Sequence, residues 1–318
     1  MLNYRTDRIG YCRTDPDGCR YRFVMRLFYL SGLFLATLPV AGAGHAQETH
    51  TSLPGSACHA TAEYLPHVDT APVQQFEILA RYPHDPDAFT QGLVFYRGEL
   101  YESTGLRGRS SIRRLELESG RVLSARRLDR ALFGEGLTVH ERQLVQLTWE
   151  TGAALLYTPP DLRRTGRFTF DGEGWGNTVV HDRLVISDGS SHLRFYAAPD
   201  YRQVASLQVT DHGRPVEGLN ELESVEDTIY ANIYPTDCIA RIDAHSGQVI
   251  SWIDLRGLMP LAQRPDSSAV ANGIAYDADT GDLLVTGKFW PHLFRLKLLD
   301  NRQPGQQAAG QGNSGRRL

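Results

Sequence analysis

The chain has 318 residues, of which 41% are hydrophobic and 22% are charged, a composition typical of a soluble globular protein. Its formal net charge of −4 at pH 7 provides no basic surface field, which argues against nucleic acid as a partner. A chain of this length can form one large domain or two small ones, and all-β barrels and propellers commonly reach this size as one unit.

The N-terminal region is predicted to be a processing segment. An apolar run from Leu27 to Val40 follows Met25 and leads into small residues that suit signal-peptidase cleavage after Ala46. We therefore predict an upstream extension at 1–24 that is not native, and a signal peptide at 25–46 that directs export to the periplasm or out of the cell. The apolar run is too short to predict a membrane span with certainty, and an uncleaved anchor is the alternative.

Export is expected to divide the four cysteines into two that are removed and two that stay in the mature protein. Cys12 and Cys19 lie upstream of the predicted cleavage site, whereas Cys58, in an N-terminal arm at 47–72, and Cys238 remain. Disulfides persist in exported proteins, so we expect a Cys58–Cys238 bridge, with two independent thiols as the alternative. No CxxC or HExxH spacing occurs in the sequence, and we predict no metal site.

A short pattern occurs five times in the body of the chain. An opening residue stands beside a small or acidic one, an apolar stretch follows, and a turn leads to a second short strand. The residues that follow the opening ones are 40 to 52 positions apart, a period typical of β-propeller blades. We predict an all-β, five-bladed propeller as the catalytic domain at 73–298, with a β-sandwich as the alternative. The five opening residues are Gln91, Glu135, Trp175, Asn220 and Asn272.

The two ends of the body are predicted to meet in one blade. The last copy supplies three strands, and the segment 75–82 before the first copy can supply the fourth. An N-terminal strand in the last blade would close the ring and remove an exposed edge. The tail at 299–318 is rich in Gln, Gly, Asn and Arg and is predicted to be disordered.

The five opening residues are expected to converge at one rim of the central channel, where a binding site would form. Glu135 is the acid among them, and burial beside Glu221 and Glu223 would raise its pKa and suit it to proton transfer. Lys288 could supply a matching cation or an oxyanion donor. The alternative is that Glu135 caps backbone NH groups and that Lys288 is simply solvated. An aromatic wall is also expected, from Phe89, Trp149, Trp175, Tyr234 and Trp290.

Long segments of the body, in the right order, carry a resemblance to a known family. From 76 to 298 the chain resembles the plant and bacterial type of glutaminyl-peptide cyclotransferase, whose fold is a five-bladed propeller. The matching segments are DPDAFTQGLVFYRGELYESTGLRGRSSIRRLELESG (85–120), FGEGLT (133–138), QLTW (146–149), GEGWG (172–176), SDGS (187–190), LNELE (219–223), YANIYPTD (230–237), NGIAYD (272–277) and TGKFWP (286–291).

The resemblance implies that the enzyme converts the N-terminal Gln of peptides to pyroglutamate with release of ammonia. Position by position, it makes Glu135 the acid and base. The implied substrate-binding residues are Phe89, Gln91, Trp149, Trp175, Asn220, Tyr234 and Lys288. Gln91, Asn220 and Lys288 are expected to hold the carboxamide or the oxyanion, and the aromatic residues the substrate stem. The family often has Trp at the position of Tyr234, so we expect activity to be retained while substrate preference stays open.

This scheme requires no metal and no cofactor. The expected partners are peptides or proteins that begin with Gln, and we expect a monomer without a membrane contact in the mature form. Two alternatives belong to other classes. One is a calcium-dependent, lactonase-like propeller hydrolase in which Glu135, Asn220 and Asn272 supply oxygen ligands. The other is a propeller that binds peptides without catalysis.

Overall fold

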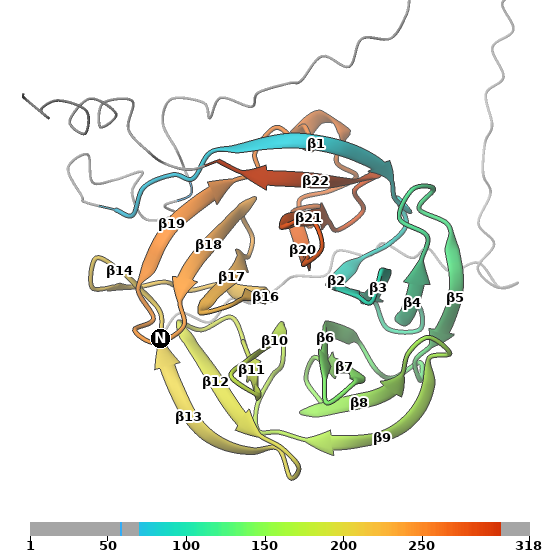
Figure 1. The fold of residues 1–318 in the computed structure, drawn as a ribbon. Helices are drawn as coiled ribbons and strands as arrows, with labels where there is room; N and C mark the ends of the chain where they lie inside the picture. Colours follow the sequence, from blue (N-terminus) through green and yellow to red (C-terminus); the bar gives the residue numbers. More distant parts are fainter. Residues whose placement is uncertain (1–57, 59–69, 300–318) are drawn as a thin grey trace, which may run out of the picture. The chain divides into compact units, whose positions relative to one another are not determined.

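Five four-stranded antiparallel sheets form a ring in the computed structural model, which describes Cys58 and residues 70–299 (Figure 1). The all-β, five-bladed propeller predicted from the sequence is thereby confirmed. Four sheets each use four consecutive strands. The first two sheets contain β2 (Thr90–Tyr96), β3 (Glu99–Thr104), β4 (Ser111–Leu115), β5 (Val122–Arg127), β6 (Gly134–His140), β7 (Gln143–Thr148), β8 (Ala153–Thr158) and β9 (Arg163–Thr169). The next two contain β10 (Asn177–Val180), β11 (Arg183–Ile186), β12 (His192–Ala197), β13 (Arg202–Gln208), β16 (Leu219–Val225), β17 (Thr228–Ile233), β18 (Cys238–Asp243) and β19 (Val249–Asp254).

The fifth sheet combines both ends of the described body. It has the strand order β1-β22-β21-β20, and β1 pairs with β22 from Phe76 opposite Leu298 to Pro83 opposite His292. The first and last described strands therefore lie side by side (Figure 1). The strands of this sheet are β1 (Phe76–Pro83), β20 (Ala271–Asp277), β21 (Asp282–Gly287) and β22 (His292–Leu298).

The remaining described elements are short. β14 (Thr210–Asp211) and β15 (Arg214–Pro215) form a two-stranded hairpin, and η2 (Leu261–Gln263) is one turn of 3-10 helix. No helix among the described residues is long and apolar enough to cross a membrane. The predicted upstream extension, the signal peptide, most of the arm and nearly all of the tail lie outside the described residues.

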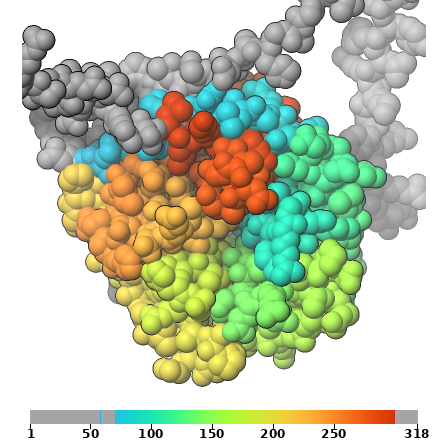
Figure 2. Space-filling view, viewed as in Figure 1, coloured from blue at the N-terminus to red at the C-terminus, as the bar shows by residue number. Residues whose placement is uncertain are grey.

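The inner strands form a closed ring of their own. β2 contacts β6 and β20, β10 contacts β6 and β16, and β16 contacts β20. Figure 2 shows the molecule as spheres from the direction of Figure 1, with the side chains of each sheet in contact with those of the next. The sheets pack face to face through apolar layers. Between the second and third sheets, for example, Val145 and Leu147 pack with Leu184 and Ile186, and all four are fully buried.

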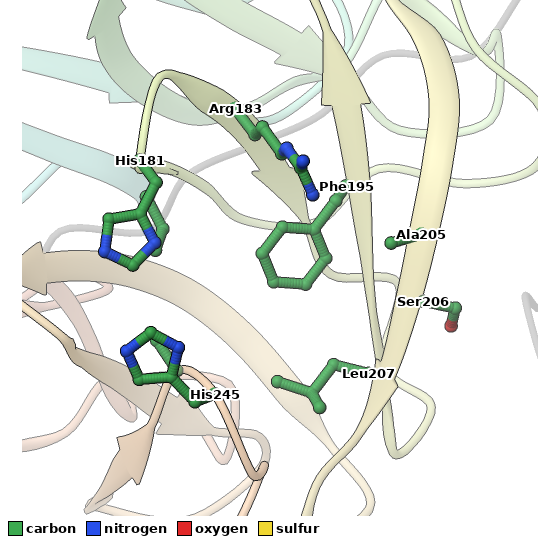
Figure 3. A pocket seen from close by; sticks show the side chains of 9 residues that line it. His181, Arg183, Phe195, Ala205, Ser206, Leu207 and His245 are labelled. Carbon is green, nitrogen blue, oxygen red and sulfur yellow. The ribbon is translucent and has the colours of Figure 1, made fainter.

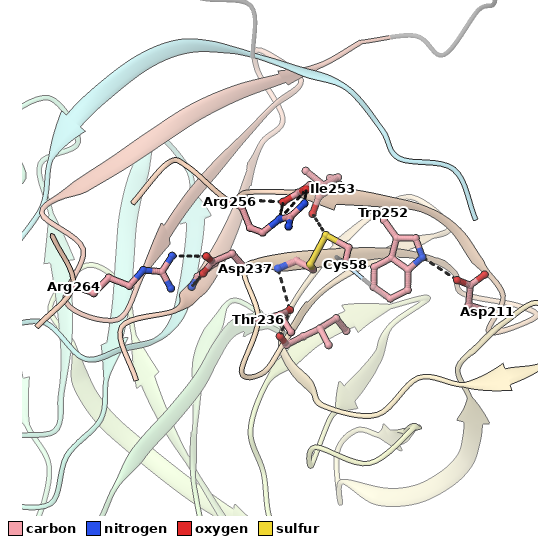
Figure 4. The surroundings of a disulfide bond; sticks show 12 residues. Cys58, Asp211, Thr236, Asp237, Trp252, Ile253, Arg256 and Arg264 are labelled. Carbon is pink, nitrogen blue, oxygen red and sulfur yellow. Dashed lines mark hydrogen bonds and ion pairs between the residues drawn. A yellow bond between two sulfur atoms is a disulfide. The ribbon is translucent and has the colours of Figure 1, made fainter. Parts of the chain in front are cut away.

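A disulfide ties the segment before β1 to the fourth sheet (Figure 4). Cys58 is bonded to Cys238, the first residue of β18, with 5.4 Å between their Cα atoms. Asp211 reinforces this attachment, because its Oδ1 accepts a hydrogen bond from Ala71 N at 2.9 Å and its Oδ2 accepts one from Trp252 Nε1 at 3.0 Å. Both Cys58 and Ala71, which precede β1, are therefore attached to the fourth sheet.

Candidate active site

β-bulges direct the side chains at the starts of the inner strands. The register with the next strand shifts between Thr90 and Gly92 in β2 and between Gly134 and Leu137 in β6, and β16 and β20 shift at the same place. A bulge leaves an extra residue outside the ladder and redirects its side chain. The residues inside these bulges include Gln91, Glu135, Asn220 and Asn272.

Glycines accompany these residues because the inner strands approach one another at backbone contact. A Cβ atom at Gly136 would lie 2.7 Å from Asn177 N, and one at Gly176 would lie 1.9 Å from Asn220 O. Gly136 N also donates a hydrogen bond to Trp175 O at 2.8 Å. A side chain at either position would force the strands apart, since protein interiors have no slack of this size. The small residue of the repeated pattern therefore sets the width of the ring beside the site.

The residues predicted from the sequence line one pocket of about 160 Å³. Pockets for drug-sized ligands usually occupy about 300–1,000 Å³, so this one suits a single small side chain. All eight predicted catalytic and substrate-binding residues are present, and Phe133 is an addition. The lining consists of Phe89, Gln91, Phe133, Glu135, Trp149, Trp175, Asn220, Tyr234 and Lys288.

Glu135 is a buried carboxyl group whose pKa is shifted strongly upward. Its side chain is only 4% exposed, and the loss of solvation raises its pKa well above the usual range. The charge of Lys288 and a hydrogen bond from Gln91 oppose this rise, while the charge of Glu173 adds to it. Asn272 holds Gln91 in place, because its Nδ2 donates to Gln91 Oε1 at 3.0 Å and leaves the Gln91 amide nitrogen for Glu135.

Lys288 is the buried cation of the pocket. Burial lowers its pKa to about 8, although the charge of Glu135 acts in the opposite direction. Its Nζ lies 4.9 Å from the ring centroid of Phe89 and 4.7 Å from that of Tyr234, within cation–π range of both. Its backbone N donates to Val270 O at 3.0 Å, which fixes the chain just after β21.

Two tryptophans are held by one carboxylate that the sequence analysis did not single out. Trp149 Nε1 and Trp175 Nε1 each donate a hydrogen bond of 2.8 Å to Glu173 Oε2. Trp175 also packs on Gly189, where a Cβ atom would lie 2.6 Å from the indole ring. Glu173 therefore orients both indoles while its charge acts on Glu135. Its position two residues before Trp175 in the GEGWG segment was the available signal.

The remaining wall combines an amide with two further aromatic rings. Asn220 Oδ1 is buried and has no hydrogen-bond partner among the described residues, so it can receive a donor from a ligand. Phe133 meets Phe89 and Trp149 edge-on at centroid distances of 6.0 and 5.5 Å. Tyr234 is 38% exposed and lies edge-on to Trp175 at 5.9 Å, which places it at the mouth of the pocket.

Four residues considered in the sequence analysis lie outside the lining of the pocket. Asn272 was expected to converge on the site with the other opening residues, but it is fully buried and acts there through its hydrogen bond to Gln91. Trp290 was expected in the aromatic wall, but it is fully buried under Gly287 and donates through Nε1 to Ala269 O at 3.2 Å. Glu221 accepts from Leu93 N at 3.2 Å and from Ile274 N at 2.8 Å, so it joins inner strands. Glu223 accepts from its neighbour Ser224 N at 2.8 Å. Neither of these glutamates lines the pocket.

Comparisons with known proteins point in one direction. The model of the glutamine cyclotransferase family matches residues 51–298. A curated relative, the glutaminyl-peptide cyclotransferase of Arabidopsis thaliana, is 40% identical over 233 residues, which are 71% of this chain and 72% of the relative. The crystal structure of Myxococcus xanthus glutaminyl cyclase superposes with a TM-score of 0.67 and 38% identity and covers 71% of this chain and 98% of that chain.

Proposed function

The chain belongs to the glutamine cyclotransferase family, and we propose that its pocket cyclises the N-terminal Gln of peptides to pyroglutamate and releases ammonia. The observation that carries this proposal is that Glu135 and Lys288, both buried, line the same pocket, which has room for one small side chain. A carboxyl group with a raised pKa and an amine with a lowered one suit proton transfer near neutral pH.

The reaction requires two proton movements and one bond exchange. The α-amine of the substrate, whose ordinary pKa is about 7.7–8.0, must be neutral to attack the side-chain carbonyl carbon. A C–N bond then forms to close the five-membered ring, and the bond from the same carbon to the carboxamide nitrogen breaks. The departing nitrogen must gain a proton to leave as ammonia. Binding the folded-back conformer lowers the entropic cost of ring closure.

Glu135 can serve both proton movements. As a carboxylate it takes a proton from the attacking amine, and as a carboxylic acid it gives one to the departing nitrogen, so it ends as it began. Its raised pKa brings it toward that of the amine, which favours transfer in both directions. The hydrogen bond from Gln91 fixes the orientation of the carboxyl group.

Lys288, Gln91 and Asn220 are assigned to the carboxamide. The carbonyl oxygen becomes negatively charged as the carbon turns tetrahedral, and a buried ammonium group stabilises such a charge far better than water-exposed groups do. The free Oδ1 of Asn220 can accept a hydrogen bond from the substrate's amine or amide nitrogen. The indoles held by Glu173 and the rings of Phe89 and Phe133 would enclose the methylene groups of the substrate.

We also propose that the reaction needs no metal ion, that the mature protein is an exported monomer, and that its substrates are peptides or proteins with N-terminal Gln. The proton transfers assigned to Glu135 and the charge of Lys288 supply the chemistry that a metal ion would otherwise provide in this pocket. The apolar run from Leu27 to Val40 supports export.

Glu135→Gln tests the proposal, because it keeps the size and hydrogen bonding of the side chain but cannot accept the proton. We expect the turnover of a Gln-Xaa peptide to fall by about 10²–10⁴-fold. Ammonia release and a peptide mass loss of about 17 Da report the ring closure. Peptide binding, measured by calorimetry, should persist in the variant.

Glu118→Gln is the matched control, since Glu118 is exposed in the turn between β4 and β5 and should be silent. Full activity of Glu135→Gln would remove Glu135 from the mechanism. Peptide binding by the wild type without any ammonia release would identify a binding protein instead. Inactivation by a chelator would contradict the metal-free mechanism and favour a calcium-dependent hydrolase.

A further inference from the structure

A cluster of potential metal-ligand side chains lies at the rim of the ring opposite the pocket. His181 is in the turn that follows β10, Asp227 is in the turn that follows β16, and His245 is in the turn that follows β18. The pocket residues Trp175 and Asn220 lie at the opposite ends of these strands instead, Trp175 two residues before β10 and Asn220 at the beginning of β16. Since each strand crosses the sheet from one rim to the other, the cluster and the pocket face opposite sides.

The three side chains converge on a single point. His181 Nε2 lies 2.7 Å from Asp227 Oδ1, and His245 Nε2 lies 3.3 Å from the same oxygen. One ring nitrogen from each histidine and one carboxylate oxygen all lie within 4.8 Å of one another. The two imidazoles stack, with ring centroids 5.3 Å apart and planes inclined by 28°. Figure 3 shows the two rings facing each other from their separate turns.

This spacing is close to that of a tetrahedral metal site. Zinc binds histidine nitrogen and carboxylate oxygen at about 2.0–2.2 Å, which places neighbouring ligand atoms about 3.3–3.5 Å apart. The contact between His245 and Asp227 already has this length, and the contact between His181 and Asp227 must lengthen from 2.7 Å to about 3.3 Å or more. All three side chains are 58–64% exposed, so a small rotation meets little resistance.

The backbone beneath the cluster is well fixed. Ala244 N donates to Asp227 O at 2.9 Å and joins the two turns of the fourth sheet. His245 N donates to Asp243 Oδ1 at 3.1 Å. Ser224 Oγ donates to Val179 O at 2.7 Å and links the fourth sheet to the third beside His181. The ligand atoms are therefore presented by braced turns of two neighbouring sheets.

A cavity of about 400 Å³ opens beside the two histidines. Arg183 and Phe195 extend into it together with His181 and His245 (Figure 3). Three protein ligands leave a tetrahedral ion one open position, which water fills in many such sites. The positive charge of Arg183 lowers the affinity for a cation but favours an anionic fourth ligand, whereas Asp182 and Glu226, the sequence neighbours of the cluster, favour the cation.

We propose that His181, Asp227 and His245 bind a divalent transition-metal ion of the zinc type and thereby clasp the third and fourth sheets together. Two imidazole nitrogens and one carboxylate oxygen suit Zn²⁺ and its neighbours in the first transition row, whereas Ca²⁺ and Mg²⁺ prefer oxygen ligands alone. The role is structural, because the cluster lies away from the pocket that contains Glu135.

Equilibrium dialysis of the full chain against Zn²⁺ tests the site. The wild type should bind one more equivalent than the double variant H181A/H245A, and this difference corrects for histidines elsewhere in the chain. Each single variant, including Asp227→Asn, should lower the affinity for this equivalent by at least about tenfold, because one of three protein ligands is lost. Ca²⁺ should not compete, because it prefers oxygen ligands alone.

His192→Ala is the matched control, because His192 is an exposed histidine on β12 outside the cluster. Zn²⁺ should raise the thermal unfolding midpoint of the wild type and of this control but not that of the double variant. Equal Zn²⁺ stoichiometry in the wild type and the double variant would overturn the proposal. Unchanged affinity in Asp227→Asn would overturn the assignment of the carboxylate.

The activity of the pocket provides a separate check. The double variant should turn over Gln peptides at the wild-type rate, since the cluster and Glu135 lie at opposite rims. A chelator should lower the unfolding midpoint of the wild type and leave its turnover at 25 °C unchanged. A turnover that falls in the double variant would show that the cluster is not merely structural.

Discussion

At the scale of single residues, the same buried pocket shifts the pKa values of an acid and a base in opposite directions. Burial raises the pKa of Glu135 and lowers that of Lys288 to about 8, so their protonation equilibria approach each other. The sequence identified both residues, because an acid between two glycines and a lysine after a strand are visible in the chain. It did not identify Glu173, whose importance comes from two indole contacts that only the folded ring creates.

Lys288→Arg should change the pH dependence of turnover. The ammonium group loses its charge as pH rises above about 8, so we expect the wild-type kcat/KM to fall on the alkaline side. A guanidinium group stays charged throughout the accessible range. The alkaline decline should therefore move upward by at least about one pH unit, with a lower maximum because the longer side chain fits the aromatic surroundings less well.

The measurement is kcat/KM between pH 6 and 10 with one Gln peptide for both proteins. The titration of the substrate amine is then common to both profiles and cancels in their ratio. An identical alkaline decline in the wild type and in Lys288→Arg would assign that decline to another group.

At the scale of elements, the period of the sequence predicted the blades well. The repeated pattern of the sequence corresponds to the sheets of the structure, four of which each consist of four consecutive strands. The β-bulges were not predicted, because a bulge depends on the register between two strands and not on the residues of one. The expectation that Trp290 belongs to the aromatic wall was wrong, because it too depended on a local backbone conformation that the residue types do not reveal. Phe289 adopts a positive φ of 61°, which reverses the chain after Lys288 and directs Trp290 into the core.

Gly176→Ala tests the close approach of the inner strands. Its Cβ atom would lie 1.9 Å from Asn220 O, so the third and fourth sheets must separate. We expect a loss of about 1–3 kcal/mol in the free energy of unfolding, as for other overpacked sites. Peptide affinity should fall as well, because Asn220 lines the pocket.

Urea denaturation provides the measurement, and Gly166→Ala on the outer strand β9 is the control. A Cβ atom there would meet Leu156 Cδ1 at an ordinary 3.5 Å, so the change should be small. Equal stability of the two variants would mean that the inner ring can widen without cost.

At the scale of the whole molecule, two glutamates of the inner strand β16, the buried Glu221 and the half-buried Glu223, are expected to make stability depend on pH. Burial raises the pKa of Glu223 to about 8 and raises the pKa of Glu221 well above its usual range. In the unfolded chain a Glu titrates near pH 4.3. The folded protein therefore holds protons that the unfolded chain has released, and the stability from these groups, complete below about pH 4.3, is lost as pH rises toward the folded pKa.

Glu223→Gln should weaken this pH dependence. The amide does not titrate, so the decline in the free energy of unfolding between pH 5 and 9 should be smaller than in the wild type. Urea denaturation at pH 5, 7 and 9 measures the decline, with Glu118→Gln as the exposed control. A variant that loses as much stability as the wild type over this range would show that Glu223 is not a source of the pH dependence.

The pairing of β1 with β22 has a consequence for how the circle can be opened. β1 belongs to the same sheet as β20, β21 and β22. The two ends of the described chain therefore meet within one sheet, and not at a boundary between two sheets. Every boundary between neighbouring blades is therefore crossed by continuous polypeptide. Opening the ring between the first and last described strands requires breaking the backbone hydrogen bonds between β1 and β22, and not only separating the apolar layers that pack between sheets.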